Sequence, residues 1–264
     1  MERISRVAVT RVRGDAREAA DDVVVLEEPL EIRVGDRPVS VTMRTPGEDF
    51  ELAAGFLFTE SIVRERDEIE SIRHWGSPNV VRVALRENAG VDLARLQRHF
   101  YSTSSCGVCG KTSIDALRVH AMPIESEVRI DARAIERLPD ALRERQEAFD
   151  ATGAIHGAAI FSADGTLLRV AEDIGRHNAV DKVIGARFLE GGAADVLVVS
   201  SRTSFEIVQK AVVARIPVLA AVGAPSSLAV ELAHEFHLTL LGFVRDGRFN
   251  VYAGGERIAY GQVS

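Results

Sequence analysis

The sequence predicts an α/β protein built from two parts of different style. From Val7 to about Arg86 the chain consists mostly of short β-branched runs with period two, which are typical of strands with one buried face. The C-terminal part alternates strand-like and helix-like runs, a pattern typical of a parallel sheet covered by helices. With 264 residues and 46% apolar content, the chain can bury a substantial core.

The N-terminal part is expected to contain a hairpin and one helix. The runs "LEIRV" and "VSVTMR" are joined by Gly35-Asp36, a pair that favours a tight turn between antiparallel strands. A helix over "FELAAGFLFTESI" is expected to be capped by Thr45, with Pro46 at its first position and Glu48 completing a capping box. A strand, "NVVRVALRE", and a short helical run, "DLARLQRHF", then lead to the cysteine segment.

The C-terminal part begins with a charged stretch, "DARAIERLPDALRERQEAFDATG", that is expected to be helical on both sides of Pro139. Asp164-Gly165 should join two strands, and "HNAVDKVIGARFLEGG" is an amphipathic helix that stops at Gly191. "DVLVVSS", "IPVLAAV" and "LTLLGFV" are strands with helical runs between them. Because ligands in such sheets lie beyond the carboxyl ends of the strands, we expect pocket loops at residues 200–204 and 223–227.

Charge and hydropathy limit the class of protein. The formal net charge is −7 with no long run of one sign, which argues against a nucleic-acid partner. No stretch approaches the roughly 18 apolar residues of a membrane span, and the N-terminus lacks the apolar segment of a secretory signal. We therefore expect a cytoplasmic protein with no membrane partner, in which the cysteines stay reduced.

The segment "SSCGVCGK" holds the only two cysteines, Cys106 and Cys109. A structural zinc site needs four ligands and a deaminase-type site needs His-x-Glu with Pro-Cys-x-x-Cys, so we expect no protein-bound zinc. The phosphate-loop pattern fails because Ser105 stands where it requires glycine. A dithiol redox pair, an inert turn and a nucleophilic sulfur remain. A glycine-rich turn at a helix start beside Lys111 lowers the pKa of a thiol and favours a nucleophile that can carry a persulfide.

A second candidate site is the turn at Asp246-Gly247, which Arg245 and Arg248 flank. Two guanidinium groups at one turn can hold a phosphate or a pyrophosphate. A plain surface hairpin is the alternative interpretation of the same residues.

A third candidate site is "AEDIGRHNAVDK", where polar side chains crowd the start of a helix. Capping by Asp173 or Asn178 explains part of this crowding. Arg176, His177 and Asn178 in a row exceed what capping needs, which indicates a pocket. His156 lies between small residues that allow close backbone approach, and either a structural or a ligand-binding role suits it.

Eight segments together make the chain resemble the formate dehydrogenase accessory sulfurtransferase family, the FdhD-type proteins. They are, in order, "EEPLEIRV", "TPGEDFELAAGFLFTESIV", "SSCGVCGK", "TGAIHGAA", "EDIGRHNAVDKVIG", "SSRTSFEIVQKA", "APSSLAVELA" and "LTLLGFVRDGRFNVY". They span nearly the whole chain, and eight in order with compatible spacing are specific although each is weak alone.

The resemblance implies a cytidine-deaminase-like α/β/α core in the C-terminal part and a smaller β-rich N-terminal region. The expected organisation is a β-rich region with one helix at residues 1–100, the cysteine loop with a short helix at 101–130, and an α/β cofactor-binding core at 131–264. A homodimer is also implied.

The function that the resemblance implies is a cytoplasmic sulfurtransferase with a cysteine persulfide intermediate. It takes sulfur from a cysteine desulfurase and delivers it to the molybdenum cofactor, bis(molybdopterin guanine dinucleotide), to activate formate dehydrogenase. The cofactor is a bound substrate, and GDP is its expected analogue because the family binds guanine nucleotides. Two alternatives stay open: a cofactor-binding chaperone without essential sulfur transfer, and a dithiol redox protein.

The motifs also assign roles to residues. By resemblance, Cys106 is the catalytic cysteine that bears the persulfide and Cys109 is its partner in the loop. Together with the candidates named above, the expected cofactor-binding residues are Val244, Arg245, Asp246, Gly247, Arg248, Phe249, His156, Arg176, His177, Asn178, Ser201 and Arg202. No metal ligand is expected. Ala154 and Ser201 stand where the family usually has glycine, so close backbone contacts in the pocket can differ here.

Overall fold

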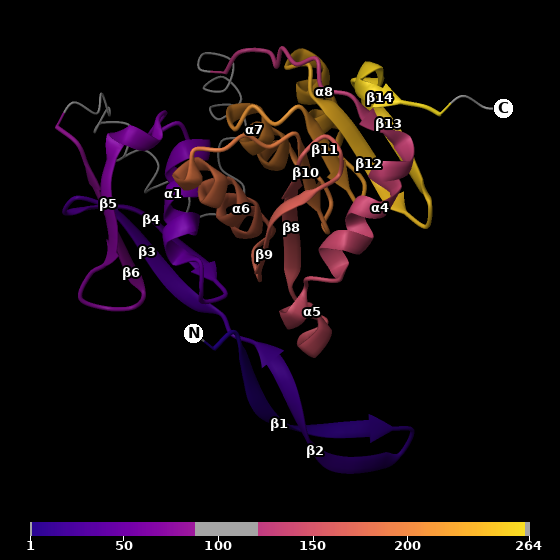
Figure 1. The fold of residues 1–264 in the computed structure, drawn as a ribbon. Helices are drawn as coiled ribbons and strands as arrows, with labels where there is room; N and C mark the ends of the chain where they lie inside the picture. The colour runs from indigo at the N-terminus through magenta and orange to yellow at the C-terminus, as the bar shows by residue number, and fades with distance from the viewer. Residues whose placement is uncertain (1, 88–120, 262–264) are drawn as a thin grey trace.

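The computed structural model describes residues 2–87 and 121–261, so Cys106 and Cys109 lie outside the described residues. The elements in chain order are β1 (Ile4–Arg13), β2 (Ala16–Val25), β3 (Glu28–Val34), β4 (Arg37–Arg44), α1 (Asp49–Thr59), η1 (Arg66–Glu68), β5 (Ile69–His74), β6 (Val80–Leu85), β7 (Ile130–Asp131), α4 (Ala132–Arg143), α5 (Glu147–Thr152), β8 (His156–Phe161), β9 (Leu167–Asp173), α6 (Arg176–Glu190), β10 (Val196–Val199), α7 (Phe205–Val213), β11 (Val218–Ala221), α8 (Ser227–Glu235), β12 (Thr239–Arg245), β13 (Arg248–Ala253), η2 (Gly255–Arg257) and β14 (Ile258–Ala259). They form an arm, a small sheet and a central sheet with helices (Figure 1).

The arm is the hairpin of β1 and β2, and it extends away from the rest of the protein (Figure 1). All ten residues of each strand are paired in an unbroken antiparallel register around the turn at Gly14. Among residues 2–87 and 121–261, no third strand joins this two-stranded sheet. The β-branched runs predicted strands here, but nothing in them indicated that the hairpin would stand alone.

The small sheet has the strand order β4-β3-β6-β5, and one of its faces packs on α1. The hairpin predicted at Gly35-Asp36 is confirmed, with Gly35 at φ 56°. Leu30, Ile32 and Leu52 are completely or almost completely buried between the sheet and the helix. The alternation of apolar and polar residues in β3 therefore produces the one-sided burial that the sequence predicted.

The predicted capping of α1 by Thr45 is wrong. The helix starts at Asp49, and Glu48 occupies the cap position with φ 56° and without a hydrogen bond from its side chain to the helix. Thr45 instead binds the central sheet: its N–H donates to the Asp173 carboxylate at 3.1 Å, and its hydroxyl accepts from the N–H of Ile174 at 3.2 Å. A contact between residues far apart in the chain thus overrides the local capping pattern.

The central sheet has the strand order β13-β12-β11-β10-β8-β9. β10, β11 and β12 are parallel as predicted, and β8 and β9 form the predicted antiparallel pair. Because β8 lies between β9 and β10 and runs opposite to both, the sheet is mixed. α6, α7 and α8 pack on one face and α4, which continues through Pro139, packs on the other. These three layers confirm the α/β fold class (Figure 1).

The small sheet is joined to the core by close packing of α1 on α6. A Cβ atom added to Gly55 would lie 1.9 Å from the carbonyl oxygen of Asp181, and one added to Gly185 would lie 1.9 Å from that of Glu51. The two helices therefore meet backbone to backbone, which only glycine allows at these positions. Phe58 and Phe188 stack beside this contact with ring centroids 4.4 Å apart.

Two buried ion pairs lie in the same contact. Lys182 Nζ is 2.8 Å from the Asp173 carboxylate and also donates to the carbonyl oxygen of Thr45 at 3.0 Å. Lys210 Nζ is 2.9 Å from the Asp181 carboxylate and 2.9 Å from the Thr59 hydroxyl. Both members of each pair belong to the core, and the hydrogen bonds of the two lysines to Thr45 and Thr59 tie the pairs to the N-terminal region.

Candidate functional site

The carboxyl ends of β9, β10, β11 and β12 meet at one edge of the central sheet, which we call the carboxyl edge. α6, α7 and α8 each begin there, at Arg176, Phe205 and Ser227. Neither α6 nor α7 has a side chain hydrogen-bonded at its cap position. The first turns of these two helices thus receive no hydrogen bond from a cap side chain, and N–H groups at helix starts bind anions well.

The loops after β10 and β11 form a ledge at this edge, comprising residues 200–204 and 223–227. The N–H of Thr203 donates to the carbonyl of Ala224 at 3.1 Å, and that of Gly223 donates to the carbonyl of Ser201 at 3.2 Å. A Cβ atom on Gly223 would lie 3.0 Å from the Cα of Arg202, so the two loops are in close backbone contact. Hydrogen bonds between backbone atoms therefore hold the two loops of the ledge together. The side chain of Arg202 is exposed on the ledge.

Thr203 lies in one of the predicted pocket loops, but the sequence did not single it out as a ligand-binding residue. It is 1% exposed, and its hydroxyl has no hydrogen-bond partner among the described residues. A buried hydroxyl without a partner is costly, which makes it a candidate to bind a ligand. Ser201, by contrast, donates its hydroxyl to the carbonyl of Arg202 at 3.0 Å.

His156 and His177 both lie at the carboxyl edge. His156 starts β8, opposite Asp173 on β9. Burial lowers the pKa of His156, and the nearby charges of Arg176 and His177 lower it further, which favours a neutral imidazole. A neutral ring nitrogen can accept a proton or a hydrogen bond.

His177 forms a small cluster with the start of α7. Its Nε2 is 3.4 Å from the Ser204 hydroxyl and 3.7 Å from the Glu206 carboxylate. The neighbouring His177 ring, with help from the Ser204 hydroxyl, lowers the pKa of Glu206 to about 2 against the opposing effect of burial. Glu206 therefore stays ionised beside the His177 ring.

Asn178 serves the contact between the two parts of the protein. Its amide nitrogen donates to the Met43 carbonyl at 2.7 Å and to the Asp173 carboxylate at 3.0 Å, while its amide oxygen accepts from the Thr42 hydroxyl at 3.1 Å. The side chain of Asn178 is thus bound to other residues of the chain. One turn further along α6, Asp181 and Lys182 also bind residues of the N-terminal region, Thr59 and Thr45.

The hairpin after β12 carries the two predicted arginines. Asp246 and Gly247 form its turn with φ 54° and 67°, and Arg245 and Arg248 are directly opposite each other in the register. Both arginines are exposed, and neither forms an ion pair with another described residue. The N–H of Phe243 donates to the carbonyl of Gly223 at 3.1 Å, which ties the hairpin to the ledge.

The rest of the predicted stretch faces inward. Val244 is fully buried in the core, and Phe249 packs against the same cluster. Within the stretch from Val244 to Phe249, Arg245, Asp246 and Arg248 therefore offer exposed side chains to a ligand.

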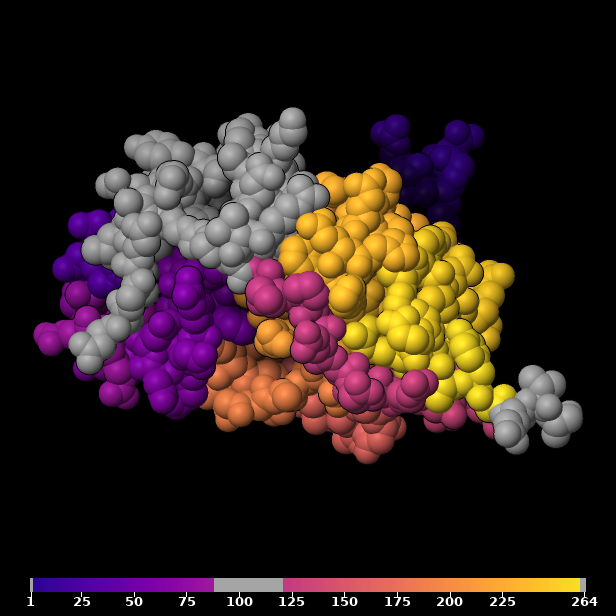
Figure 2. Space-filling model, turned by 90° about the horizontal axis from the view of Figure 1, so that it is seen from above, coloured from indigo at the N-terminus to yellow at the C-terminus, as the bar shows by residue number. Residues whose placement is uncertain are grey.

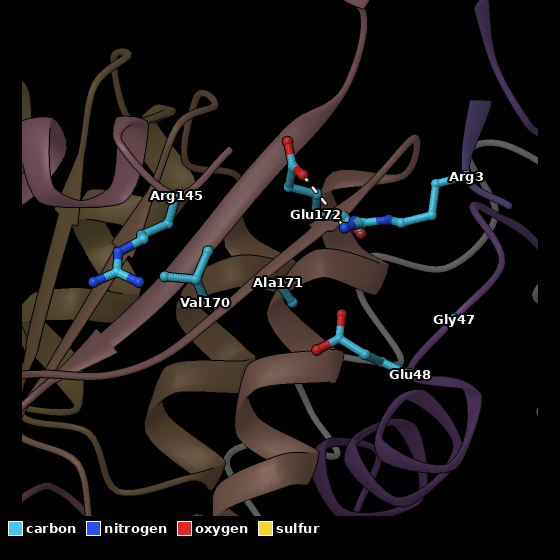
Figure 3. Close-up of a pocket in the computed structure, with 7 residues that line it drawn as sticks. All are labelled: Arg3, Gly47, Glu48, Arg145, Val170, Ala171 and Glu172. Carbon is cyan, nitrogen blue, oxygen red and sulfur yellow. Dashed lines mark hydrogen bonds and ion pairs between the residues drawn. The ribbon is translucent and has the colours of Figure 1, made fainter. Parts of the chain in front are cut away.

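A cavity of about 190 Å³ opens beside β9 (Figure 3). Arg3, Glu48, Arg145 and Glu172 line it and come from four separate segments. Glu172 accepts hydrogen bonds from the N–H groups of Ala148 and Phe149 and is 3.4 Å from Arg3. Burial raises the pKa of Glu48 despite the surrounding cations. Of these residues, Glu172 lies within the third candidate site of the sequence analysis, and Glu48 was expected there only to cap a helix.

The cysteine segment rejoins the described structure at the opposite edge of the sheet. The N–H of Ile124 donates to the carbonyl of Phe236, just after α8, and Arg257 donates to the carbonyl of Ile124. Seen from above, the residues after position 121 (magenta) run beside the C-terminal strands (yellow) (Figure 2).

Two kinds of feature are not found in residues 2–87 and 121–261: a membrane-spanning helix and a cluster of metal ligands. No helix in these ranges is long and apolar enough to cross a membrane. No three His, Cys, Asp or Glu side chains in them are grouped so that they could hold a metal ion.

Comparison with known proteins gives consistent matches over nearly the full chain. The FdhD/NarQ family profile matches residues 25–259. A Streptomyces avermitilis protein named sulfur carrier protein FdhD is 49% identical, covering 96% of this chain and 95% of its own. A Mycolicibacterium paratuberculosis protein of the same name is 48% identical, covering 98% and 100%. A crystal structure from Desulfotalea psychrophila, provisionally described as a formate dehydrogenase accessory protein, superposes with a TM-score of 0.80 at 23% identity, covering 98% and 100%.

Proposed function

Because the chain belongs to the FdhD/NarQ family, we propose that it is a sulfur carrier for the molybdenum cofactor. In this proposal Cys106 accepts a sulfur atom, and the carboxyl edge binds the bis(molybdopterin guanine dinucleotide) form of the cofactor as substrate. The names of the relatives support the sulfur carrier role. The arrangement of anion-binding groups at the carboxyl edge is the observation that supports the cofactor role.

The residues at the carboxyl edge fit a guanine dinucleotide. Its pyrophosphates need several N–H donors and cations, which two uncapped helix starts and the guanidinium groups of Arg245 and Arg248 provide. Thr203 supplies a hydroxyl that has no partner among the described residues. His156, kept neutral by its surroundings, can accept a hydrogen bond from a base or ribose.

The proposed loading step is an exchange between two cysteines. The Cys106 thiolate attacks the terminal sulfur of a persulfide on a cysteine desulfurase. The S–S bond on the desulfurase breaks, a new S–S bond forms on Cys106, and the desulfurase cysteine leaves as a thiolate. Cys109 is close enough in sequence to relay or resolve the persulfide.

The proposal includes the partners that such a carrier needs. A cysteine desulfurase supplies the sulfur, and a formate dehydrogenase receives the completed cofactor. We further propose that the protein is cytoplasmic and that it is a homodimer. The shared fold alone does not supply these assignments, which depend on the site and on the relatives.

Mass spectrometry tests the loading step. After incubation with a cysteine desulfurase and cysteine, the full chain should gain the mass of one sulfur atom, and Cys106→Ser should not. An adduct that persists on Cys106→Ser would contradict the assignment of the carrier residue.

Maturation of formate dehydrogenase in cells tests the alternatives. We expect Cys106→Ser to abolish maturation. If this variant still matured the enzyme, the protein would act as a cofactor-binding chaperone. If a reversible disulfide between Cys106 and Cys109 proved necessary for each turnover, the dithiol redox alternative would replace the carrier.

A further inference from the structure

The cavity beside β9 contains two charged side chains that have no partner among the described residues. Glu48 is half-buried and Arg145 is exposed, and the side chain of neither forms a hydrogen bond or an ion pair there. The other two charged residues of the cavity satisfy each other, since Arg3 lies 3.4 Å from the Glu172 carboxylate. The cavity therefore offers a ligand one free carboxylate and one free guanidinium group.

The backbone of Glu48 is strained. Its φ of 56° lies in the left-handed region, which glycine adopts freely and other residues rarely adopt. The strain does not serve α1, because the Glu48 side chain makes no cap hydrogen bond to that helix. Its carboxylate instead points toward Ala171 in the cavity (Figure 3). Burial raises the pKa of Glu48 although the charge of Lys182 opposes this effect. Strain of this kind is typical of ligand-binding sites.

The open edge of β9 also lines the cavity. β9 is an edge strand of the central sheet, so every second residue turns its backbone groups away from β8. Gly157, which lies opposite Glu172, donates to the Ser200 hydroxyl at 2.9 Å and accepts from the Ser200 N–H at 3.0 Å. Glu172, and Val170 two residues earlier, therefore direct their backbone groups outward. No hydrogen bond from elsewhere in residues 2–87 and 121–261 reaches the N–H and C=O of Val170.

The two free charges come from opposite faces of the central sheet. Arg145 lies between α4 and α5, and α4 packs on the face to which Val170 belongs. Glu48 directly precedes α1, which packs on α6 at the other face, where Ala171 is part of the core. A ligand that meets both charges must therefore pass the unpaired backbone groups of Val170. Because a cavity of about 150 Å³ holds benzene, one of about 190 Å³ has room for a dipeptide backbone.

We infer that this cavity binds a short peptide with both ends free, of about dipeptide size. The ammonium group of the peptide pairs with Glu48, and its terminal carboxylate pairs with Arg145. Its peptide group forms hydrogen bonds with the backbone of Val170, as an added strand does at a sheet edge. The ledge residues do not line the cavity, so this site is separate from the proposed nucleotide site and does not rest on the proposed function.

Calorimetric titration of the full-length protein with glycylglycine tests the inference. We expect saturable binding at millimolar concentration. Glu48→Gln and Arg145→Met should each weaken it at least about tenfold, because each removes a charged partner of the peptide. N-acetylglycylglycine and glycylglycinamide each lack one charged end, and both should bind the wild type at least about tenfold more weakly. Free glycine should also bind weakly, because its two charges lie too close together to reach both partners.

Glu48→Gly separates binding from damage to the fold. Glycine adopts a φ of 56° freely, and the Glu48 side chain has no cap hydrogen bond to lose. This variant should therefore unfold at a temperature no lower than the wild type while losing the peptide. Glu144→Gln is the matched control: it makes the same change as Glu48→Gln beside Arg145 but outside the cavity, and should leave binding unchanged.

Three results would overturn the inference. They are a wild-type chain without saturable binding of glycylglycine, full affinity for glycine or for either blocked peptide, and unchanged affinity in Glu48→Gln or Arg145→Met. GDP titrations of the same variants keep this site apart from the carboxyl edge, which should bind GDP with wild-type affinity in all of them. A failure of the peptide site would thus leave the proposed nucleotide site standing.

Discussion

The start of α6 and its following turns belong to one motif, "EDIGRHNAVDK", yet they use their polar residues in opposite ways. Arg176 and His177 lie at the carboxyl edge, where His177 makes only long contacts of 3.4 and 3.7 Å. Asp173, Asn178 and Lys182 are buried in the contact with the N-terminal region and hold short hydrogen bonds. The exposed start of α6 thus offers a binding surface, whereas the buried side of the helix holds the N-terminal region against the core. Substitutions on the two sides should therefore affect different measurements.

The largest expected effect is on the buried side. Lys182→Met should lower the free energy of unfolding by about 3–5 kcal/mol, because it leaves the Asp173 carboxylate buried without its cation. Urea denaturation measures this loss. Asp173→Asn/Lys182→Met is the control and should lose less, since it removes both charges. A loss below about 1 kcal/mol in the single variant would show that the buried ion pair of Lys182 and Asp173 does not stabilise the contact between the two parts.

The next effect concerns the backbone contact of α1 and α6. Gly185→Ala should lower the free energy of unfolding by about 1–3 kcal/mol, because its Cβ atom would lie 1.9 Å from the Glu51 carbonyl oxygen and the helices must separate. The higher helix propensity of alanine opposes this by only about 1 kcal/mol. Gly261→Ala, which has no atom within 4 Å of its added Cβ, should be neutral. Thermal unfolding of both variants provides the comparison.

A smaller effect, of opposite sign, is expected at the carboxyl edge. Thr203→Val should raise the free energy of unfolding by about 1 kcal/mol, because it removes a buried hydroxyl that has no partner among the described residues. The same variant should bind GDP more weakly. Thr239→Val is the matched control: its hydroxyl donates to the Gly254 carbonyl, so losing it should destabilise the protein. Equal destabilisation of the two variants would mean that Thr203 is satisfied within the fold.

The smallest effect concerns pH. The lowered pKa of Glu206 adds stability that is complete above its ordinary value of 4.5 and is lost as the pH falls toward about 2. Glu206→Gln should therefore be less stable than the wild type at pH 6 and equally stable near pH 2. The difference should stay below about 1 kcal/mol because the side chain is 42% exposed and screened by solvent. An unchanged difference across this range would rule out the contact of Glu206 with His177 as its source.

Local patterns predicted most elements of the fold because those elements obey local rules. The alternation in β3, the parallel strands β10 to β12 and the end of α6 at Gly191 all follow from short-range periodicity and turn chemistry. The start of α1 does not follow from these local rules, because Thr45 binds Asp173, a residue 128 positions away. The isolated arm was also missed, since strand propensity does not reveal whether a third strand will join.

The candidate site was predictable in part for the same reason. The Asp246-Gly247 turn fixes the positions of Arg245 and Arg248 through local geometry, so the sequence sufficed. Asn178 appeared to be a pocket residue, but its helical position turns it toward Met43. Thr203 and the residues around the cavity beside β9 become visible only when distant segments are brought together.

Calorimetric titration of GDP tests most directly whether the carboxyl edge is the nucleotide site. Arg245→Ala and Arg248→Ala should each weaken binding by about 1.5–3 kcal/mol, roughly ten- to a hundredfold, because each removes a charge-assisted hydrogen bond to phosphate. Their free energies of unfolding should match that of the wild type, since both side chains are exposed. Unchanged affinity in the double variant would contradict the account and place the nucleotide elsewhere on the protein.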